Sequence, residues 1–293
     1  MKKITPILAI LLISLTWAGC NRGEEGCLDP AAENFNPSAS RYGPCEYAMD
    51  TGDIDPNMVI VKIHVEPKVK GQAFELEKVY QDSLNRDFKV SDFRFYVANV
   101  NLINSENKEH QVTKTELIDH NTFPPISPTQ PTWDRTIEGF VMPGTYQELF
   151  MGFGVDPELN EAYNHMDYPS DHPLSIAYTN MGWPWKSKYI FATINGNIDS
   201  VGNGDLVEHF YIHSGYSDLY RTNRFDLKDP INFEPGKTYH LYFEQDVLRT
   251  FSGLDMATEE GKSHTQNAEK KKISIQFQEN LTHSLKFSRY TED

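Results

Sequence analysis

The sequence predicts an all-β protein, a β-sandwich or Greek-key barrel of about 8–10 strands, with a small disulfide-closed N-terminal module. Three observations carry this prediction. Aromatic residues make up 12% of the 293 residues, and 18 Gly and 17 Pro supply turns, a composition that favours strands over helices. Short apolar runs alternate with polar residues, and turn residues separate nearly all of them. No segment repeats with a period of 20–50 residues, which excludes solenoids and propellers.

The strand pattern starts near residue 58. From residue 59 to residue 65 every second side chain is apolar, as in a strand buried on one face. Only residues 245–251 and part of 157–166 are compatible with a helical turn, and the polar stretch 259–272 is interpreted as a mobile hairpin end. Further strand-like runs lie at residues 88–103, 113–119, 137–141, 146–155, 189–194, 206–213, 239–243, 273–277 and 285–290.

The N-terminus has the features of a secretory signal. Two lysines precede an apolar run over residues 7–18, which is too short to cross a bilayer of ~30 Å as a helix. Residues 17–20 resemble a bacterial lipobox, in which Cys20 is lipidated and becomes the first residue; plain secretion with a nearby cleavage is the alternative. We therefore predict a signal peptide over residues 1–19, then a lipid anchor, a Cys-stapled module and a linker over 20–57.

The remaining residues, 58–293, form the predicted β domain. The lipid anchor would tether this domain to a membrane without embedding it. We expect a lipoprotein of the bacterial cell envelope, held at the outer membrane on its periplasmic face or at the cell surface.

Two further cysteines follow Cys20. Once Cys20 carries lipid, Cys27 and Cys45 remain as an even pair in an oxidising compartment, where a disulfide is expected. They lie within the segment GCLDPAAENFNPSASRYGPCEY, which resembles a short Cys-stapled module of secreted Bacteroidetes proteins. Arg41 and Tyr42 stand where that module has two Asp residues, so the oxygen ligands that calcium needs are missing. We interpret the module as a spacer near the anchor.

Charge and motifs exclude several classes of function. Acidic residues outnumber basic ones by 42 to 27, and the net charge of −15 repels phosphate backbones, so nucleic acid is not expected as a partner. The sequence has no G-x-S-x-G elbow, no H-E-x-x-H and no phosphate-binding glycine loop. We therefore expect no enzyme.

One aromatic run and several histidines are candidates for a binding site. In an extended segment, Met181, Trp183 and Trp185 would align on one face, as core residues or as the lining of a site. His209 and His213 would share a strand face about 13 Å apart, so at most one of them joins any single metal site.

Three other histidines are candidate metal ligands. His165 and His172 lie in a polar loop beside Met and Asp residues, and His64 lies on the first strand. Imidazole is a ligand that suits copper and zinc.

Four blocks in order along residues 58–250 resemble the MbnP-like family, named after a periplasmic copper-binding protein associated with methanobactin operons. The match is specific because the blocks occur in the family's order. They are residues 92–102 (DFRFYVANVNL), 116–119 (ELID), 143–160 and 181–196, the last followed by residues 212–215 (IHSG).

The resemblance implies a β-sandwich or Greek-key barrel that binds one copper ion. It also implies that a tryptophan is oxidised to kynurenine by a partner dihaem enzyme of the cytochrome-peroxidase type. His213 matches a family histidine, and Trp183 and Trp185 match the paired tryptophans, either of which is open to modification.

Two interpretations follow. In the first, His213 and one of His165, His172 or His64 bind copper without catalysis, and oxygen or kynurenine donors from the tryptophan region complete the site. In the second, the same fold binds no metal and contacts a protein or glycan partner through exposed aromatic side chains. The first requires the imidazole of His213 to meet another imidazole.

Overall fold

The structure is a computed structural model. It describes residues 25–26, 36, 38–39, 41–42, 57–121, 135–162, 168, 172–183, 188–265 and 267–293. The signal peptide and five predicted functional residues lie outside this part of the chain: Cys20, Cys27, Cys45, His165 and Trp185. Near the N-terminus, β1 (Glu25–Gly26) and β2 (Arg41–Tyr42) pair in parallel. The disulfide between the two cysteines stays a prediction.

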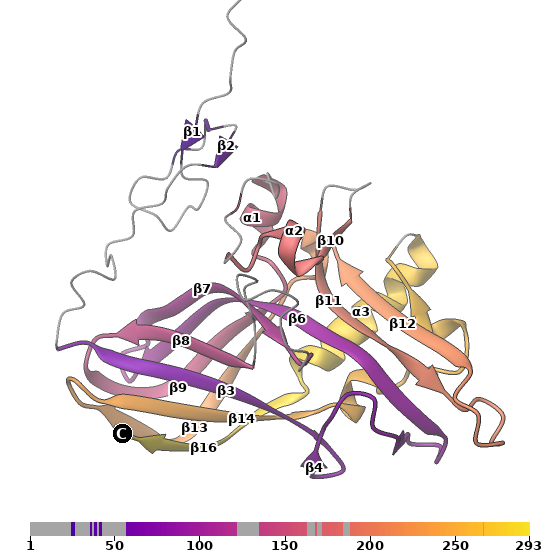
Figure 1. The fold of residues 1–293 in the computed structure, drawn as a ribbon. Coiled ribbons are helices and arrows are strands. Elements are labelled where there is room, and N and C mark those ends of the chain that lie inside the picture. The colour runs from indigo at the N-terminus through magenta and orange to yellow at the C-terminus, as the bar shows by residue number, and fades with distance from the viewer. Residues whose placement is uncertain are drawn as a thin grey trace, which may run out of the picture.

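Two sheets build the β domain (Figure 1). The larger has nine strands, and its central path runs β13-β9-β6-β11-β12-β15, with β5 and β7 on β6 and β10 on β11. Its strands are β5 (Tyr80–Gln81), β6 (Asp87–Asn104), β7 (Glu109–Asp119), β9 (Gly144–Phe153), β10 (Gly182–Trp183), β11 (Lys188–Ile198), β12 (Glu208–Gly215), β13 (Arg221–Phe233) and β15 (Lys262–Ser263).

The smaller sheet has five strands in the order β16-β14-β3-β4, with β8 on β3. These are β3 (Val59–Val69), β4 (Gln72–Ala73), β8 (Thr136–Val141), β14 (Thr238–Asp246) and β16 (Leu285–Glu292). The prediction of an all-β sandwich is therefore confirmed for the described residues. The strands outnumber the 8–10 expected because two-residue strands such as β4, β5, β10 and β15 are too short for a periodic signal.

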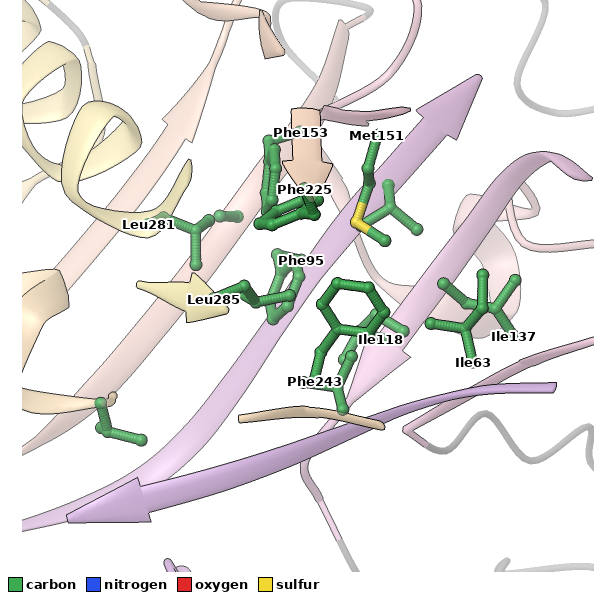
Figure 2. Close-up of a cluster of buried hydrophobic side chains, with 14 of the residues drawn as sticks. Ile63, Phe95, Ile118, Ile137, Met151, Phe153, Phe225, Phe243, Leu281 and Leu285 are labelled. Carbon is green, nitrogen blue, oxygen red and sulfur yellow. The ribbon is translucent and has the colours of Figure 1, made fainter. Parts of the chain in front are cut away.

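The main core lies between the two sheets, and Figure 2 shows part of it. The residues that alternate inward along each strand meet here, and burial of each large apolar side chain contributes ~1.5–3 kcal/mol. Met151, Phe153, Phe225, Phe95 and Ile118 come from the nine-stranded sheet, Ile63, Ile137, Phe243 and Leu285 from the five-stranded sheet, and Leu281 from a helix.

Helices are few. The turns predicted within residues 157–166 and 245–251 are confirmed as α1 (Pro157–Ala162) and the 3-10 turn η2 (Leu248–Phe251). The others are α2 (Ile176–Thr179), η1 (Ser217–Leu219), η3 (Glu259–Gly261) and α3 (Ala268–Thr282). No helix of the described residues is long and apolar enough to cross a membrane.

The strand predicted at residues 273–277 is wrong, because helix α3 occupies this segment. Ile and Phe residues alternate here with a period of two, as in a strand. The helix buries Ile273, Phe277 and Leu281 at a spacing of four, but it also buries the polar Ser274 and Gln278. Because part of the buried face is polar, the apolar residues alone do not show the helical period of about 3.6 residues.

Strand β13 was also missed, for a different reason. It is an edge strand of the large sheet and carries Asp, Lys, Arg and Pro among its apolar residues. Edge strands use such residues to resist pairing with other chains. The alternation of buried and exposed side chains therefore stops after Leu227 and starts again at Ile231.

One buried polar contact joins the two sheets through the core. His120, directly after β7, places Nε2 2.8 Å from Oε1 of Gln245 on β14. Both side chains are buried, with 2% and 0% exposed. Burial lowers the pKa of His120 to about 3, so the ring is neutral and donates to the amide oxygen.

We predict that His120→Ala lowers the free energy of unfolding by about 3 kcal/mol, since it opens a cavity and leaves the Gln245 oxygen without its partner. Urea unfolding at pH 7 measures this change. The control is His209→Ala, at an exposed position of β12, for which a change within ~0.5 kcal/mol is expected. Equal losses in the two variants would contradict the prediction.

Candidate metal centre

A row of polar side chains crosses three neighbouring strands on the face of the nine-stranded sheet that is turned away from the main core. We call this the outer face. The register pairs Asn195 of β11 with Asp92 of β6 and with Tyr211 of β12. The next step along the strands pairs Thr193 with Arg94 and with His213.

The intervening residues point the other way. Phe93, Ile194 and Ile212 are paired across the same three strands and are fully buried in the main core. Because side chains alternate along a strand, burial of these three residues turns their polar neighbours to the outer face.

A chain of hydrogen bonds links the residues of the polar row and ends at His213. Arg94 donates from Nε to Oδ1 of Asp92 at 2.8 Å, and Asn195 donates from Nδ2 to Oδ2 of Asp92 at 2.9 Å. The Asn195 oxygen Oδ1 then lies 2.8 Å from Nε2 of His213. Since this oxygen only accepts, Nε2 of His213 carries the hydrogen, and the lone pair of the ring is on Nδ1.

A second imidazole meets this lone pair. Nδ1 of His264 lies 3.0 Å from Nδ1 of His213, with the rings at 75°. Tyr211 stacks on His264 with ring centroids 4.5 Å apart. Two metal–nitrogen bonds of ~2.0–2.1 Å at angles of about 90–109° separate their nitrogens by about 2.8–3.4 Å. The two Nδ1 atoms therefore have the spacing of two ligands of one ion.

A strained turn holds His264 in place. The next residue, Thr265, has a φ of 56°, in the left-handed region that a β-branched residue rarely adopts. Its hydroxyl donates to the carbonyl of His213 at 2.8 Å and also contacts Ser274 Oγ at 2.8 Å. Ser263 on the other side of His264 contacts the same Ser274 hydroxyl at 3.0 Å.

The buried polar face of α3 thus positions the histidine. Gln278, one turn beyond Ser274, accepts from the hydroxyl of Ser214 on β12 at 2.7 Å and donates to the carbonyl of Phe153 at 3.1 Å. These contacts tie α3 to the strand that carries His213. An unfavourable backbone conformation of this kind persists only where many surrounding contacts stabilise it, and it is common at functional sites.

The surroundings keep both rings neutral. Burial, and then the nearby His264, lower the pKa of His213 to about 4, although the carboxylate of Asp92 acts in the opposite direction. Burial also lowers the pKa of His264. Neutral imidazoles are the form that binds metal ions.

The tryptophan strand lies beside this pair. Trp183 on β10 packs over Gly215, where an added Cβ would lie 2.5 Å from Cζ3 of the indole. Gly215 is two residues beyond His213 on the same face of β12, which is ~7 Å along the strand. The indole is 3% exposed, and its Nε1 has no hydrogen-bond partner among the described residues.

Met181 and Trp183 belong to a second apolar cluster on the outer face, to which α1 contributes Leu159 and against which Ile176 of α2 packs. The candidate metal centre is at the border of this cluster. Its members are Tyr96, Leu117, Val155, Leu159, Leu174, Met181, Trp183, Tyr189, Ile190, Phe191 and Leu219.

The other predicted histidines lie elsewhere. His172 stacks on Tyr168 with ring centroids 4.1 Å apart, and its Nδ1 accepts from the backbone of Leu174. His64 lies on β3 of the other sheet and contacts His240, not His213. His165 and Trp185 lie outside the described residues.

His264 was missed by sequence reasoning, which interpreted residues 259–272 as a hairpin end. No local pattern marks this histidine, because its partner is 51 residues away. Among the described residues, no set of three His, Cys, Asp or Glu side chains surrounds one point. Further ligands of an ion at the pair would come from water or from other donor groups.

We predict that the His213 ring titrates near pH 4 in a proton NMR titration, while the exposed His209 serves as the internal control. An unfolded histidine titrates near pH ~6.5. Between these values the unfolded chain takes up a proton that the folded protein rejects, so His213 lowers the free energy of unfolding as the pH falls from about 6.5 towards 4. Titration of His213 at pH 6 or above would contradict this.

Three comparisons relate the chain to known proteins. Among solved structures, MbnP from Methylosinus trichosporium is similar, with 17% identity, a TM-score of 0.44, and coverage of 68% of this chain and 80% of that one. A search of curated proteins gives no match. The family model for MbnP matches residues 59–269, which is more than half of the chain and includes both His213 and His264. The chain therefore belongs to the MbnP family.

Proposed function

We propose that this protein is an envelope lipoprotein with a site for a single copper ion between Nδ1 of His213 and Nδ1 of His264, which serves copper handling or acquisition without catalysis. One observation carries the proposal: the 3.0 Å separation of these two nitrogens. Membership of the MbnP family supports copper as the ion. The donor set also fits, because imidazole suits copper and Cu(II) binds most tightly among the divalent ions of the first transition row.

The residues around the pair supply what a metal ligand needs. Asn195 and Asp92 fix the His213 ring and its tautomer through the outer nitrogen, as partners of ligating histidines do in many metal sites. In the metal-free pair, Nδ1–H of His264 donates to Nδ1 of His213. To hold an ion at Nδ1, His264 would carry its hydrogen on Nε2 instead, so that the ring stays neutral, and both rings would tilt so that their lone pairs converge.

The tryptophan region is the proposed place of modification. Oxidation of Trp183 or Trp185 to kynurenine by a dihaem cytochrome-peroxidase-type partner would add an aromatic amine near the pair. The position of Trp183 over Gly215 supports this proposal. Met181, fully buried in the same apolar cluster, would line the site. Mass spectrometry of protein made in its own host tests for the modification.

The proposed location rests on the N-terminal sequence. A lipid on Cys20 would anchor the chain in the outer membrane, and the Cys27–Cys45 module would separate the β domain from the bilayer. The alternative function, a metal-free module that binds a protein or glycan, gains no support from Trp183. This side chain is 3% exposed and offers little contact area to a partner.

We predict that His213→Ala and His264→Ala each remove the copper bound at this pair, because a single imidazole is left. Asn195→Ala weakens binding about 10–100-fold, since it removes the hydrogen bond that orients His213. Competition titrations with a copper chelator, supported by elemental analysis, measure these changes.

The matched control is His209→Ala, which removes an exposed histidine of the same strand and should bind as the wild type does. Circular dichroism confirms that each variant is folded. Wild-type copper affinity in both His213→Ala and His264→Ala would overturn the proposal.

A further inference from the structure

We propose a second metal site, for a borderline divalent ion such as Cu(II) or Zn(II), at His64 and His240 on the five-stranded sheet. Nε2 of His64 lies 2.9 Å from Nδ1 of His240. This separation, like that of the first pair, is within the ~2.8–3.4 Å expected between two nitrogen ligands of one ion.

The parallel pairing of β3 and β14 produces this contact. The register pairs His64 with Tyr242 and His240 with Lys62, so the two histidines are diagonal neighbours on one face. Ile63 of β3, between these positions, is fully buried in the main core. The alternation along both strands therefore turns the histidines away from the core.

Ring contacts hold the orientation of the pair. The two imidazole rings are nearly parallel, with an interplanar angle of 7° and centroids 5.2 Å apart, so they meet edge to edge through the nitrogen–nitrogen contact. His64 also stacks on Tyr242 at 4.7 Å, and the guanidinium of Arg289 lies 3.9 Å from the centre of the same tyrosine ring. These contacts hold the inner nitrogens next to each other before any ion arrives, and a turn of both rings would let their lone pairs converge on one ion.

The outer nitrogens have partners of the kind found behind metal-bound histidines. Nε2 of His240 lies 3.1 Å from Oδ2 of Asp293, so this nitrogen carries the hydrogen and Nδ1 keeps its lone pair. Nδ1 of His64 lies 3.3 Å from Oγ1 of Thr136. Two backbone hydrogen bonds between Asp293 and Thr238 of β14 hold the carboxylate in register.

The proton balance is then simple. Without an ion, Nε2–H of His64 donates to Nδ1 of His240. When an ion binds, this proton would shift to Nδ1 of His64, where the N–H donates a hydrogen bond to the Thr136 hydroxyl, and both inner lone pairs would be free to serve as ligands. His240 keeps 17% of its side chain exposed, so water can occupy the remaining coordination positions.

The charges nearby do not oppose a cation. Arg289 is paired with Glu66, and Lys62 is paired with Glu138 at 3.1 Å. The carboxylate of Asp293 adds a negative charge on the outer side of His240. Two neutral imidazoles with water select borderline ions over Mg²⁺ and Ca²⁺, which need oxygen ligands.

The test uses the full chain with the first pair removed by His213→Ala and His264→Ala together. We expect this double variant to bind about one equivalent of Cu(II) or Zn(II) in calorimetric titrations, with nitrogen couplings in the Cu(II) electron paramagnetic resonance spectrum. Adding His64→Ala or His240→Ala should abolish that binding, whereas adding His209→Ala should not change it. Asp293→Asn should weaken binding about 10–100-fold through the orientation of His240.

The two proposals fail separately. No metal bound by the folded double variant, or equal binding after His240→Ala is added, would overturn the second site and leave the first untouched. Conversely, an unchanged number of bound copper ions in the single variants of the first pair would overturn the proposed function alone. Zn(II)-induced shifts of the His64 and His240 ring protons in the NMR spectrum give an independent readout of the second site.

Discussion

The alternation of side chains along β6, β11 and β12 is the constraint on which the candidate metal centre depends. Phe93, Ile194 and Ile212 fill the main core, and their burial turns Asp92, Asn195 and His213 to the outer face. The register then brings Asn195 within hydrogen-bond distance of both Asp92 and His213. A shift of one residue in any of these strands would reverse both faces, so the apolar core protects the polar row from slipping.

The histidine that completes the pair depends on a different constraint. Part of the buried face of helix α3 is polar, because it carries Ser274 and Gln278. Their side chains form hydrogen bonds with hydroxyl groups on both sides of His264 and on β12. A buried polar network with every member paired is rigid. This rigidity holds Thr265 in its left-handed conformation, and the turn at Thr265 aims the His264 ring at His213.

The two histidine pairs share one arrangement on two different sheets. In each, the inner nitrogens face each other at 2.9–3.0 Å, and the outer nitrogen of one ring is held by an amide or a carboxylate. They differ in their surroundings. The His213 pair borders a second apolar cluster that includes Trp183, whereas the His64 pair is set among ion pairs and a stacked Arg–Tyr contact.

The sequence by itself determined the strands with clear alternation, such as β3, β6 and β14. In a strand, residues two positions apart lie on the same face, so apolar residues at every second position mark the buried face. It also singled out His213 as a candidate ligand, whereas the outer face on which it lies and the nearness of Trp183 came from the structure. Only the tertiary structure decided the helical state of α3, the edge strand β13 and the partners of His213 and His64. A helix with a buried polar face and a strand at a sheet edge both lose their periodic signal. Contacts such as His213–His264, 51 residues apart, depend on register and on a strained turn, which local sequence does not encode.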